Sequence, residues 1–370
     1  MPTIDACLFR TEEEARSVAR GTIALHGCRH CGLVWNAAFE EEKVLYDGTY
    51  EGGQTASPTF NRFHRALAAD LVARCGLAGR RVLEIGCAQG EFLELVAEAG
   101  IGAIGFDPSY RAGPLPDGVT IHAQVYDGAP APDDVGLIAC KMTLEHIPET
   151  DRFLAGIRRG IGARGDVRAF LMIPEFDKIM AERRFWDLHY EHCVFFTPGA
   201  LARAVRRAGL VPEDIWLGFG DQYVSILARP GAPERDLPLE EPARATVEKV
   251  DRFASGLAAN VEAWRARFRA WREGGERVVL WGGGAKAVSF LSALGTDANV
   301  LGAVDINPMR QTTYLAGSAV PILAPGALGA LAPDRVVVMS PIYLDEIRRM
   351  LADLGLHPVM VSVQDPDARR

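Results

Sequence analysis

Apolar and polar residues are arranged along the chain in a way that predicts two successive units of alternating strands and helices. In the first unit, apolar runs read as strands at 81–87, 102–107, 137–142, 168–174 and 223–230. Helical segments such as 91–100 and 198–210 separate most of these runs. The second unit has a similar series at 277–281, 300–308, 335–341 and 358–363. Such alternation is typical of an α/β fold with a mostly parallel sheet covered on both faces.

The same pattern predicts how the chain divides into domains. Residues 1–36 show little helical periodicity and form a segment of their own. Residues 37–228 hold the first α/β unit, which an amphipathic helix within 61–77 precedes. Residues 229–242 are rich in proline and charge and read as a linker, and a long helix is expected at about 243–273. Residues 274–370 then form a second Rossmann-like unit.

Composition narrows the class of protein further. Hydrophobic residues make up 48% and charged residues 24%, which is typical of a water-soluble globular protein. The formal net charge is −8 without a long basic run, so a nucleic-acid partner is not expected. No stretch of about 18 apolar residues suggests a membrane span, and the N-terminus lacks the pattern of a signal peptide. We therefore expect a cytoplasmic protein, whose seven cysteines are thiols or metal ligands rather than disulfides.

A glycine-containing turn follows the first predicted strand of the first unit. In "VLEIGCAQGEFLELV", Gly86 and Gly90 stand four residues apart, Glu84 precedes them, and Cys87 lies within the turn. Glycine allows a tight turn and the close approach of a ligand, and a helix N-terminus favours a polar or anionic group. Asp107, followed by Pro108, ends the next strand, where an acidic residue can accept bonds from ribose hydroxyls.

The spacing E-x-G-x-x-x-G differs from the three-glycine dinucleotide fingerprint. It resembles motif I of the class I methyltransferases that use S-adenosylmethionine. In that family the glycine turn holds the amino-acid end of the cofactor and the acidic residue holds the ribose. This resemblance implies cofactor contacts by Glu84, Gly86, Cys87, Gly90, Asp107 and Pro108. The segment "LEHI" after a later strand adds His146, which the resemblance places near the transferred methyl group as a substrate contact.

Three further segments resemble the deoxysugar C-methyltransferases. They are "CRHCGLVWN", similar to half of a zinc ribbon, "FWDLHYEHCVFFT" at 185–197, and "GGGAKAVSFLSALG" with the following "VDINPMRQTTYLAGSAVPI". The resemblance covers nearly the whole chain and implies a nucleotide-linked 4-keto deoxysugar as small-molecule substrate. The chain departs from the family pattern at three places. His189 stands where the family has tyrosine, and Tyr190 stands where it has histidine. Met142 replaces an expected asparagine, and residues 219–226 lack an expected histidine.

The segment at 185–197 carries the predicted catalytic chemistry. Methylating carbon requires an enolate, and histidine is suited to remove the proton beside a ketone because its reference pKa is about 6.5. We predict that His192 is this base and that Glu191 orients it or binds a sugar hydroxyl. A hydrogen bond from His189 or Tyr190 would stabilise the enolate oxygen. The ring of Trp186 is expected to exclude water and stack on the substrate.

Two features of the sequence support weaker predictions. Cys28 and Cys31 form one C-x-x-C pair, and Cys7 could join them with His26 or Asp5 in a degenerate zinc site, although a ribbon without metal is equally compatible. The H-x-x-H spacing of His189 and His192 lacks a third nearby ligand. In the second unit, three consecutive glycines precede Lys286, which could contact a substrate diphosphate.

The sequence leaves other functions open. The same cofactor could serve methylation of oxygen or nitrogen in a sugar or small metabolite, since that reaction also uses a histidine base. A nucleotide-binding protein without methyltransferase activity is a third interpretation. The sequence does not predict the oligomeric state.

Overall fold

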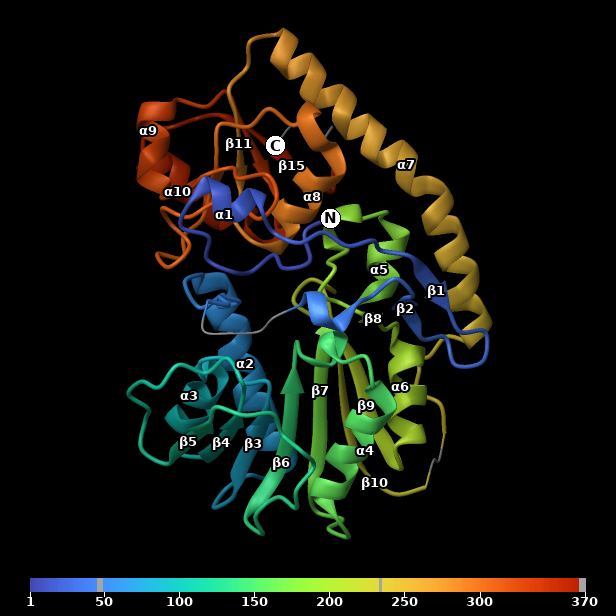
Figure 1. The fold of residues 1–370 in the computed structure, drawn as a ribbon. Helices are drawn as coiled ribbons and strands as arrows, with labels where there is room; N and C mark the ends of the chain where they lie inside the picture. Colours follow the sequence, from blue (N-terminus) through green and yellow to red (C-terminus); the bar gives the residue numbers. More distant parts are fainter. Residues whose placement is uncertain (45–48, 233–234, 366–370) are drawn as a thin grey trace.

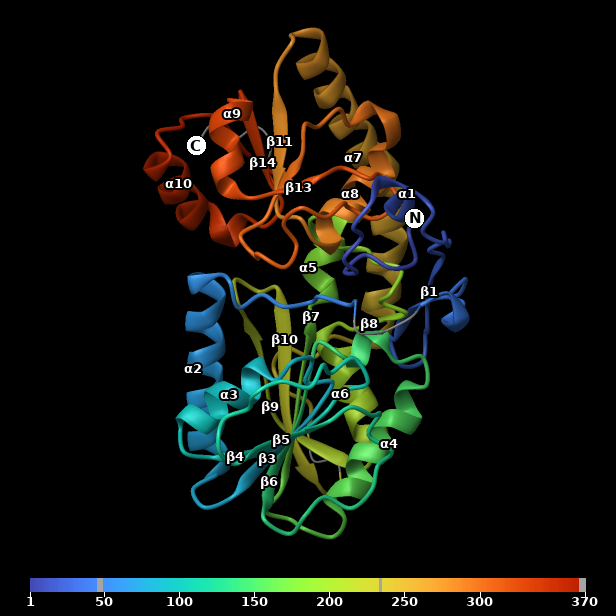
Figure 2. The ribbon, with the colours of Figure 1, turned by 60° about the vertical axis from the view of Figure 1, so that its left-hand side comes forward.

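The computed structural model describes residues 1–44, 49–232 and 235–365. Two α/β units stand one above the other, and the N-terminal segment passes between them (Figure 1). The long helix α7 (Ala243–Glu273) runs along one side of both units (Figures 1 and 2). Its bounds agree with the long helix that the sequence predicts. No described helix has the length and apolarity needed to cross a membrane.

The first unit is built on a seven-stranded sheet in the order β5-β4-β3-β6-β7-β10-β9. Five strands are parallel: β3 (Arg81–Ile85), β4 (Gly102–Phe106), β5 (Val119–His122), β6 (Val135–Lys141) and β7 (Arg168–Pro174). The last two, β9 (Leu210–Gly218) and β10 (Tyr223–Pro230), form an antiparallel hairpin beside β7. The central position of β6 explains why all seven of its residues are buried.

Helices cover both faces of this sheet. One face packs against α2 (Pro58–Cys75) and α3 (Glu91–Glu98), and the other packs against α4 (Thr150–Ile161) and α6 (Pro198–Arg207). The sequence sets the ends of α2 locally. The Ser57 side chain accepts a bond from the Phe60 N–H at its start, and Gly76 ends it in the left-handed conformation.

The second unit has five parallel strands in the order β13-β12-β11-β14-β15. These are β11 (Val278–Trp281), β12 (Ala303–Val304), β13 (Ile322–Leu323), β14 (Arg335–Val338) and β15 (Val359–Ser362). Its helices are α8 (Ala285–Leu294), α9 (Leu328–Leu331) and α10 (Leu344–Asp353). Trp264 and Phe268 of α7 pack against Phe290 of α8, so the long helix belongs to this core.

The N-terminal segment forms α1 (Glu12–Arg16) and a hairpin of β1 (Leu25–Gly27) and β2 (Val34–Asn36). The hairpin pairs with β8 (Val194–Phe195), where Val34 lies opposite Phe195. The short helix α5 (Phe176–Ala181) and α7 cover this small sheet. The segment at 185–197 is therefore tied to the start of the chain. Short 3₁₀ turns complete the fold at Glu41–Lys43, Leu144–His146 (η2), Phe185–Asp187 (η3), Gly295–Asp297, Pro325–Ala327 and Pro341–Tyr343.

Two strands of the first sheet differ from the sequence prediction. Both β5 and β9 lie at its edges and were not among the predicted runs. An edge strand needs little continuous apolar sequence, and it tolerates Pro212, which lies opposite Ala228 beside an irregularity in the β9–β10 register.

Candidate functional site

One cavity of about 430 Å³ lies between the two α/β units. Both glycine turns contribute to its wall, through Gly86 after β3 and Gly282 after β11. Residues 52–57, which precede α2, and Asp5 of the N-terminal segment complete the wall. Ligands of α/β sheets bind at the carboxyl ends of strands, and here two such ends share one cavity.

The first glycine turn has the backbone geometry that its sequence predicts. Gly86 has φ +71°, and a Cβ at this position would collide with the side chain of Thr143. Gly90 has φ +97° and begins α3, where a Cβ would lie 2.6 Å from Cδ1 of Ile121. Only glycine fits both positions without strain. Gly86, Cys87 and Ala88 line the cavity, whereas Gly90 shapes the turn from behind.

A buried ion pair lies beneath this turn. Nζ of Lys141, at the end of β6, is 2.5 Å from Oε1 of Glu84 and 4.2 Å from the centre of the Phe92 ring. Both charged side chains line the cavity and are almost fully buried. The second carboxylate oxygen of Glu84, Oε2, is buried and has no hydrogen-bond partner in the structure. A buried oxygen without a hydrogen-bond partner favours binding of a ligand that carries an N–H or O–H donor.

Asp107 directly follows β4 and supports the turn. Its Oδ2 accepts a 2.8 Å hydrogen bond from the Ala88 N–H, and its Oδ1 accepts bonds from the N–H and hydroxyl of Ser109. Asp107 does not reach the cavity wall in this structure, and Pro108 is exposed. Cofactor contact by either residue therefore stays a prediction, while bracing of the turn by Asp107 is observed.

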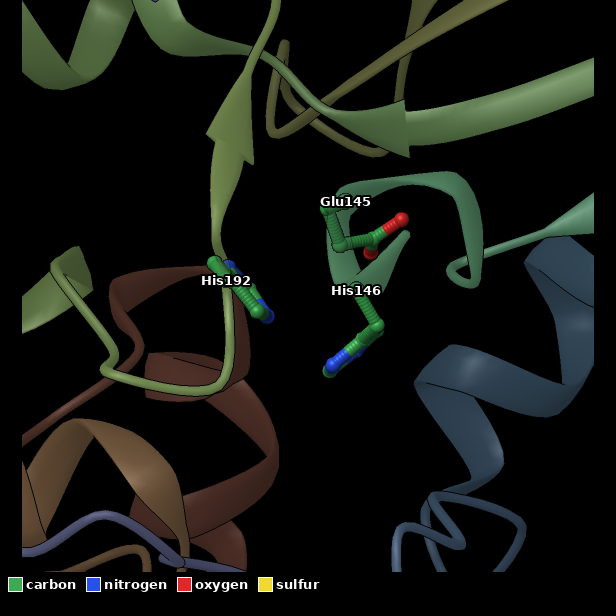
Figure 3. Close-up of side chains that lie close together, drawn as sticks. All are labelled: Glu145, His146 and His192. Atoms are coloured by element: carbon green, nitrogen blue, oxygen red, sulfur yellow. The ribbon is translucent and has the colours of Figure 1, made fainter. Parts of the chain in front are cut away.

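His146, His189 and His192 line the cavity and form one cluster of rings. The ring of His192 meets the ring of His146 at 4.8 Å and that of His189 at 4.9 Å, in both cases edge to face. His146 and Glu145 come from η2, and His192 comes from the segment before β8 (Figure 3). Two segments that lie far apart in the sequence thus place their imidazoles together.

The N-terminal segment completes this cluster through Asp5. Oδ2 of Asp5 lies 3.3 Å from Nδ1 of His189, and its N–H donates a 2.7 Å hydrogen bond to Oε1 of Glu191. Nδ1 of His189 also lies 2.9 Å from the Ser289 hydroxyl of α8. His189 is therefore held from both the N-terminal segment and the second unit.

Burial changes the protonation of most of these groups. It lowers the pKa of His146 to about 4, and it lowers the pKa of His192 well below its ordinary range, with a further contribution from the neighbouring histidines. Burial and the Asp5 charge raise the pKa of Glu191 well above its usual value. Burial alone would raise the pKa of Asp5, but His189 outweighs it, so the net shift is downward. At neutral pH His146 and His192 are therefore unprotonated imidazoles.

Two residues predicted to face the substrate lie elsewhere. The hydroxyl of Tyr190 accepts a bond from the Glu40 N–H and donates one to the Ala38 carbonyl, so it anchors the N-terminal segment outside the cavity. Trp186 packs against Phe185 and Phe290 in the core of the second unit. Neither side chain lines the cavity in this structure, so substrate contact by either residue stays a prediction.

The predicted zinc site is not formed. Cys28 and Cys31 lie at the turn between β1 and β2. The backbone of Cys7 instead pairs with that of Tyr50 in an isolated antiparallel β-bridge. In the part of the chain that the structure describes, the one group of three or more metal-ligand side chains is Glu145, His146 and His192. Its ligand atoms lie within 4.8 Å of one another, a looser spacing than the about 3.4 Å between ligands of a tetrahedral ion. We assign no ion to this group.

The second glycine turn repeats the arrangement of the first. Oδ2 of Asp305, after β12, accepts a bond from the Gly283 N–H, and its Oδ1 accepts one from Asn307. Lys286, at the start of α8, lines the cavity and forms an ion pair with Asp187 of η3. This pair links the segment at 185–197 to the second unit.

Several cavity residues carry no motif and were missed from the sequence. His64 of α2 is buried with neither ring nitrogen hydrogen-bonded, and burial together with Lys141 lowers its pKa to about 3. Lys141 lies in a predicted strand and Glu145 in the "LEHI" segment, but only the folded chain shows that their side chains line the cavity. The sequence suggests Asp5 only as a possible metal ligand. The one available signal was the unusual lysine in the otherwise apolar strand β6.

Comparison with protein families decides the class. A methyltransferase domain model matches residues 60–214, and a model described as the C-methyltransferase C-terminal domain matches residues 237–356. The chain is a class I S-adenosylmethionine-dependent methyltransferase. The two matched ranges correspond to the two α/β units that share the cavity.

Relatives of the methyltransferase differ in how much of the chain they match. The C-methyltransferase NovU of Streptomyces niveus is 26% identical over 86% of this chain and 80% of its own length. A ubiquinone biosynthesis O-methyltransferase of Cupriavidus pinatubonensis is 30% identical over 36% of this chain and 61% of its own length. Among solved structures, the calicheamicin biosynthesis methyltransferase CalO1 is 19% identical, covering 45% of this chain and 54% of its own, with a TM-score of 0.35.

The cavity of the methyltransferase fits its cofactor on two observations. The unpartnered Oε2 of Glu84 can accept a hydrogen bond from the cofactor's ammonium group. The space that a Cβ would occupy at Gly86 allows close approach of the backbone. Glu84 and residues 86–88 would therefore hold the amino-acid end of the cofactor.

Proposed function

We propose that the methyltransferase methylates a carbon atom beside the ketone of a nucleotide-linked 4-keto deoxysugar. The observation that carries the proposal is that His192 and the glycine turn at Gly86 line one cavity. The match of residues 237–356 to a C-methyltransferase domain supports methylation of carbon, as does the relative NovU. The cavity also extends along the second unit, where Lys286, Asn307 and Arg310 line it, so a nucleotide would find polar side chains there.

In this reaction His192 removes the proton from the carbon beside the ketone. Its depressed pKa keeps the imidazole unprotonated at neutral pH, which a base requires. The electron pair of the broken C–H bond becomes the enolate, and the cofactor supplies the methyl group that this carbon receives. The sugar and the cofactor fill the cavity that His192 lines, which keeps water from competing for the carbanion equivalent.

Glu191 and His189 position the reacting groups. Nδ1 of His189 lies near Asp5 and Ser289, and these contacts fix the orientation of the ring. They thereby also fix the position of its other nitrogen, Nε2. Glu191, whose pKa burial and the Asp5 charge raise, lines the cavity and can hydrogen-bond a sugar hydroxyl. Both residues therefore act on the sugar rather than on the methyl donor.

A second candidate is methylation of a hydroxyl group, which the partial match to ubiquinone biosynthesis O-methyltransferases favours. The two reactions differ in one observable. Enolate formation exchanges a carbon-bound proton with solvent, whereas hydroxyl methylation does not.

The test uses thymidine diphosphate-linked 4-keto-6-deoxyglucose in D₂O, followed by NMR. We expect deuterium at the carbon beside the ketone without cofactor, and a new C–CH₃ signal when S-adenosylmethionine is added. His192→Asn should lose both signals. A new O–CH₃ signal without deuterium incorporation would establish the second candidate instead.

A further inference from the structure

We infer that the side chain of Glu145 is a further catalytic residue, which donates a hydrogen bond to the developing enolate oxygen while His192 removes the proton. This inference rests on the proposed function, because it needs an enolate. Glu145 belongs to η2 and is 3% exposed, yet it is one of the residues that line the cavity.

The first observation is that the carboxyl group of Glu145 is unsatisfied. Its Oε2 is buried without a hydrogen-bond partner, and the described residues form no ion pair with it. A buried polar atom of this kind costs about 1–3 kcal/mol unless a ligand pairs with it. A substrate oxygen in the cavity would provide that partner.

The second observation is the distance between Glu145 and the proposed base. A carboxylate oxygen of Glu145 and a ring nitrogen of His192 lie within 4.8 Å of each other. In a ketone the oxygen and the carbon that loses its proton are about 2.4 Å apart. A donor at about 2.7 Å from that oxygen and a base at about 3 Å from that carbon fit this separation.

The protonation of Glu145 follows from its surroundings. Burial raises its pKa to about 8, so the group is a neutral acid at neutral pH and has a proton to donate. Five titratable side chains near Glu145 come from β6, η2, the segment before β8, and β10. They are Cys140, His146, His192, Cys193 and Tyr223, and their shifted pKa values leave them uncharged at neutral pH.

The reaction balances with these groups alone. The C–H bond breaks, its proton goes to His192, and its electron pair forms the C=C bond of the enolate. The carbonyl π pair moves to the oxygen, to which the Glu145 O–H donates. The carbon then bonds to the methyl group as the S–C bond breaks, S-adenosylhomocysteine leaves, and the His192 proton passes to solvent. Glu145 keeps its proton throughout.

The test compares wild type, Glu145→Gln and Glu145→Leu by deuterium exchange into the same keto sugar. Removing one oxyanion donor costs about 10²–10³ in rate, so we expect this loss in the Leu variant and a smaller loss in the Gln variant, which keeps an N–H donor. Wild-type exchange should fall as pH rises above about 8, since the donor ionises. The Gln variant should lack this fall, and its affinity for S-adenosylmethionine should be unchanged.

The outcomes separate the inference from the function. The inference alone is overturned if both variants exchange deuterium as fast as the wild type. It is also overturned if the exchange rate of Glu145→Gln still falls above about pH 8. Activity that EDTA removes and Mn²⁺ restores also overturns it, because Glu145 would then be a metal ligand. Absence of exchange in the wild type overturns the proposed function as well. The Gln variant keeps the test decisive if the Leu variant does not fold.

Discussion

The rings of His146 and His192 meet edge to face, with centroids 4.8 Å apart and planes at 87°. His146 comes from the turn after β6 and His192 from the segment before β8, so two separate segments of the first unit each supply one ring. Two protonated imidazoles at this distance would repel each other in a buried site. The pair therefore holds one proton at most, which suits a site that accepts a proton from substrate.

Replacing His192 by asparagine should reduce turnover by about 10²–10⁴, the usual range for losing a general base. The affinity for S-adenosylmethionine should persist, because Glu84 and the glycine turn are untouched. Single-turnover kinetics and calorimetry measure the two quantities. The matched control is His122→Asn at an exposed strand end, which should turn over like wild type. Equal turnover in both variants would remove His192 from the mechanism.

Acidification should destabilise the protein partly through His64. Its pKa of about 3 in the folded state lies below the reference value of about 6.5, so the unfolded chain binds the proton first as pH falls. Stability is therefore lost as pH drops below about 6.5, by about 2 kcal/mol at pH 5.

His64→Phe should remove that loss, because the new ring packs beside Phe60 and carries no titratable nitrogen. Urea unfolding at pH 7 and pH 5 gives the difference. His122→Phe serves as the control and should keep the wild-type loss. A His64→Phe variant as sensitive to acid as wild type would contradict the prediction.

Gly86→Ala should weaken binding of S-adenosylmethionine at least about tenfold, since the added Cβ collides with Thr143 at a positive φ. The comparison is Gly165→Ala, where a Cβ meets no neighbouring atom within 4 Å. Calorimetric titration of both variants with the cofactor distinguishes them. Wild-type affinity in Gly86→Ala would show that the turn does not approach the cofactor.

Lys141→Met should lower the free energy of unfolding by about 3–5 kcal/mol, because it leaves the buried Glu84 carboxylate without its partner. Adding Glu84→Gln should restore much of this loss. The exposed pair Arg81–Asp134 is the matched control, and Asp134→Asn should cost about 0–1 kcal/mol. Urea unfolding of wild type and these three variants measures the losses. Equal losses in Lys141→Met and Asp134→Asn would mean that the buried pair adds no stability.

Much of the fold could be predicted because it depends on local patterns. The buried strand β6 and the turn at Gly86 have periodicity and glycine spacing that admit few other structures. The edge strand β9 could not be predicted in this way. Its Pro212 and adjacent acidic residues read as a loop, and only pairing with β10 makes it a strand.

The site was less predictable because it depends on contacts between distant segments. The histidines of 185–197 were identified, but the direction of each side chain could not be predicted, and neither Tyr190 nor Trp186 lines the cavity. Asp5 stands far from His189 in the sequence, and no spacing rule connects them. The orphaned oxygen of Glu145 is a property of the packed interior alone.

The contact between Asp5 and His189 has a practical consequence for handling the enzyme. Residues near the beginning of the chain thread between the two units, and the amino group of Met1 is held by the Gly21 carbonyl. A protease that trims residues 1–5 would remove the carboxylate beside His189. The mass of each preparation should therefore be checked before activities are compared.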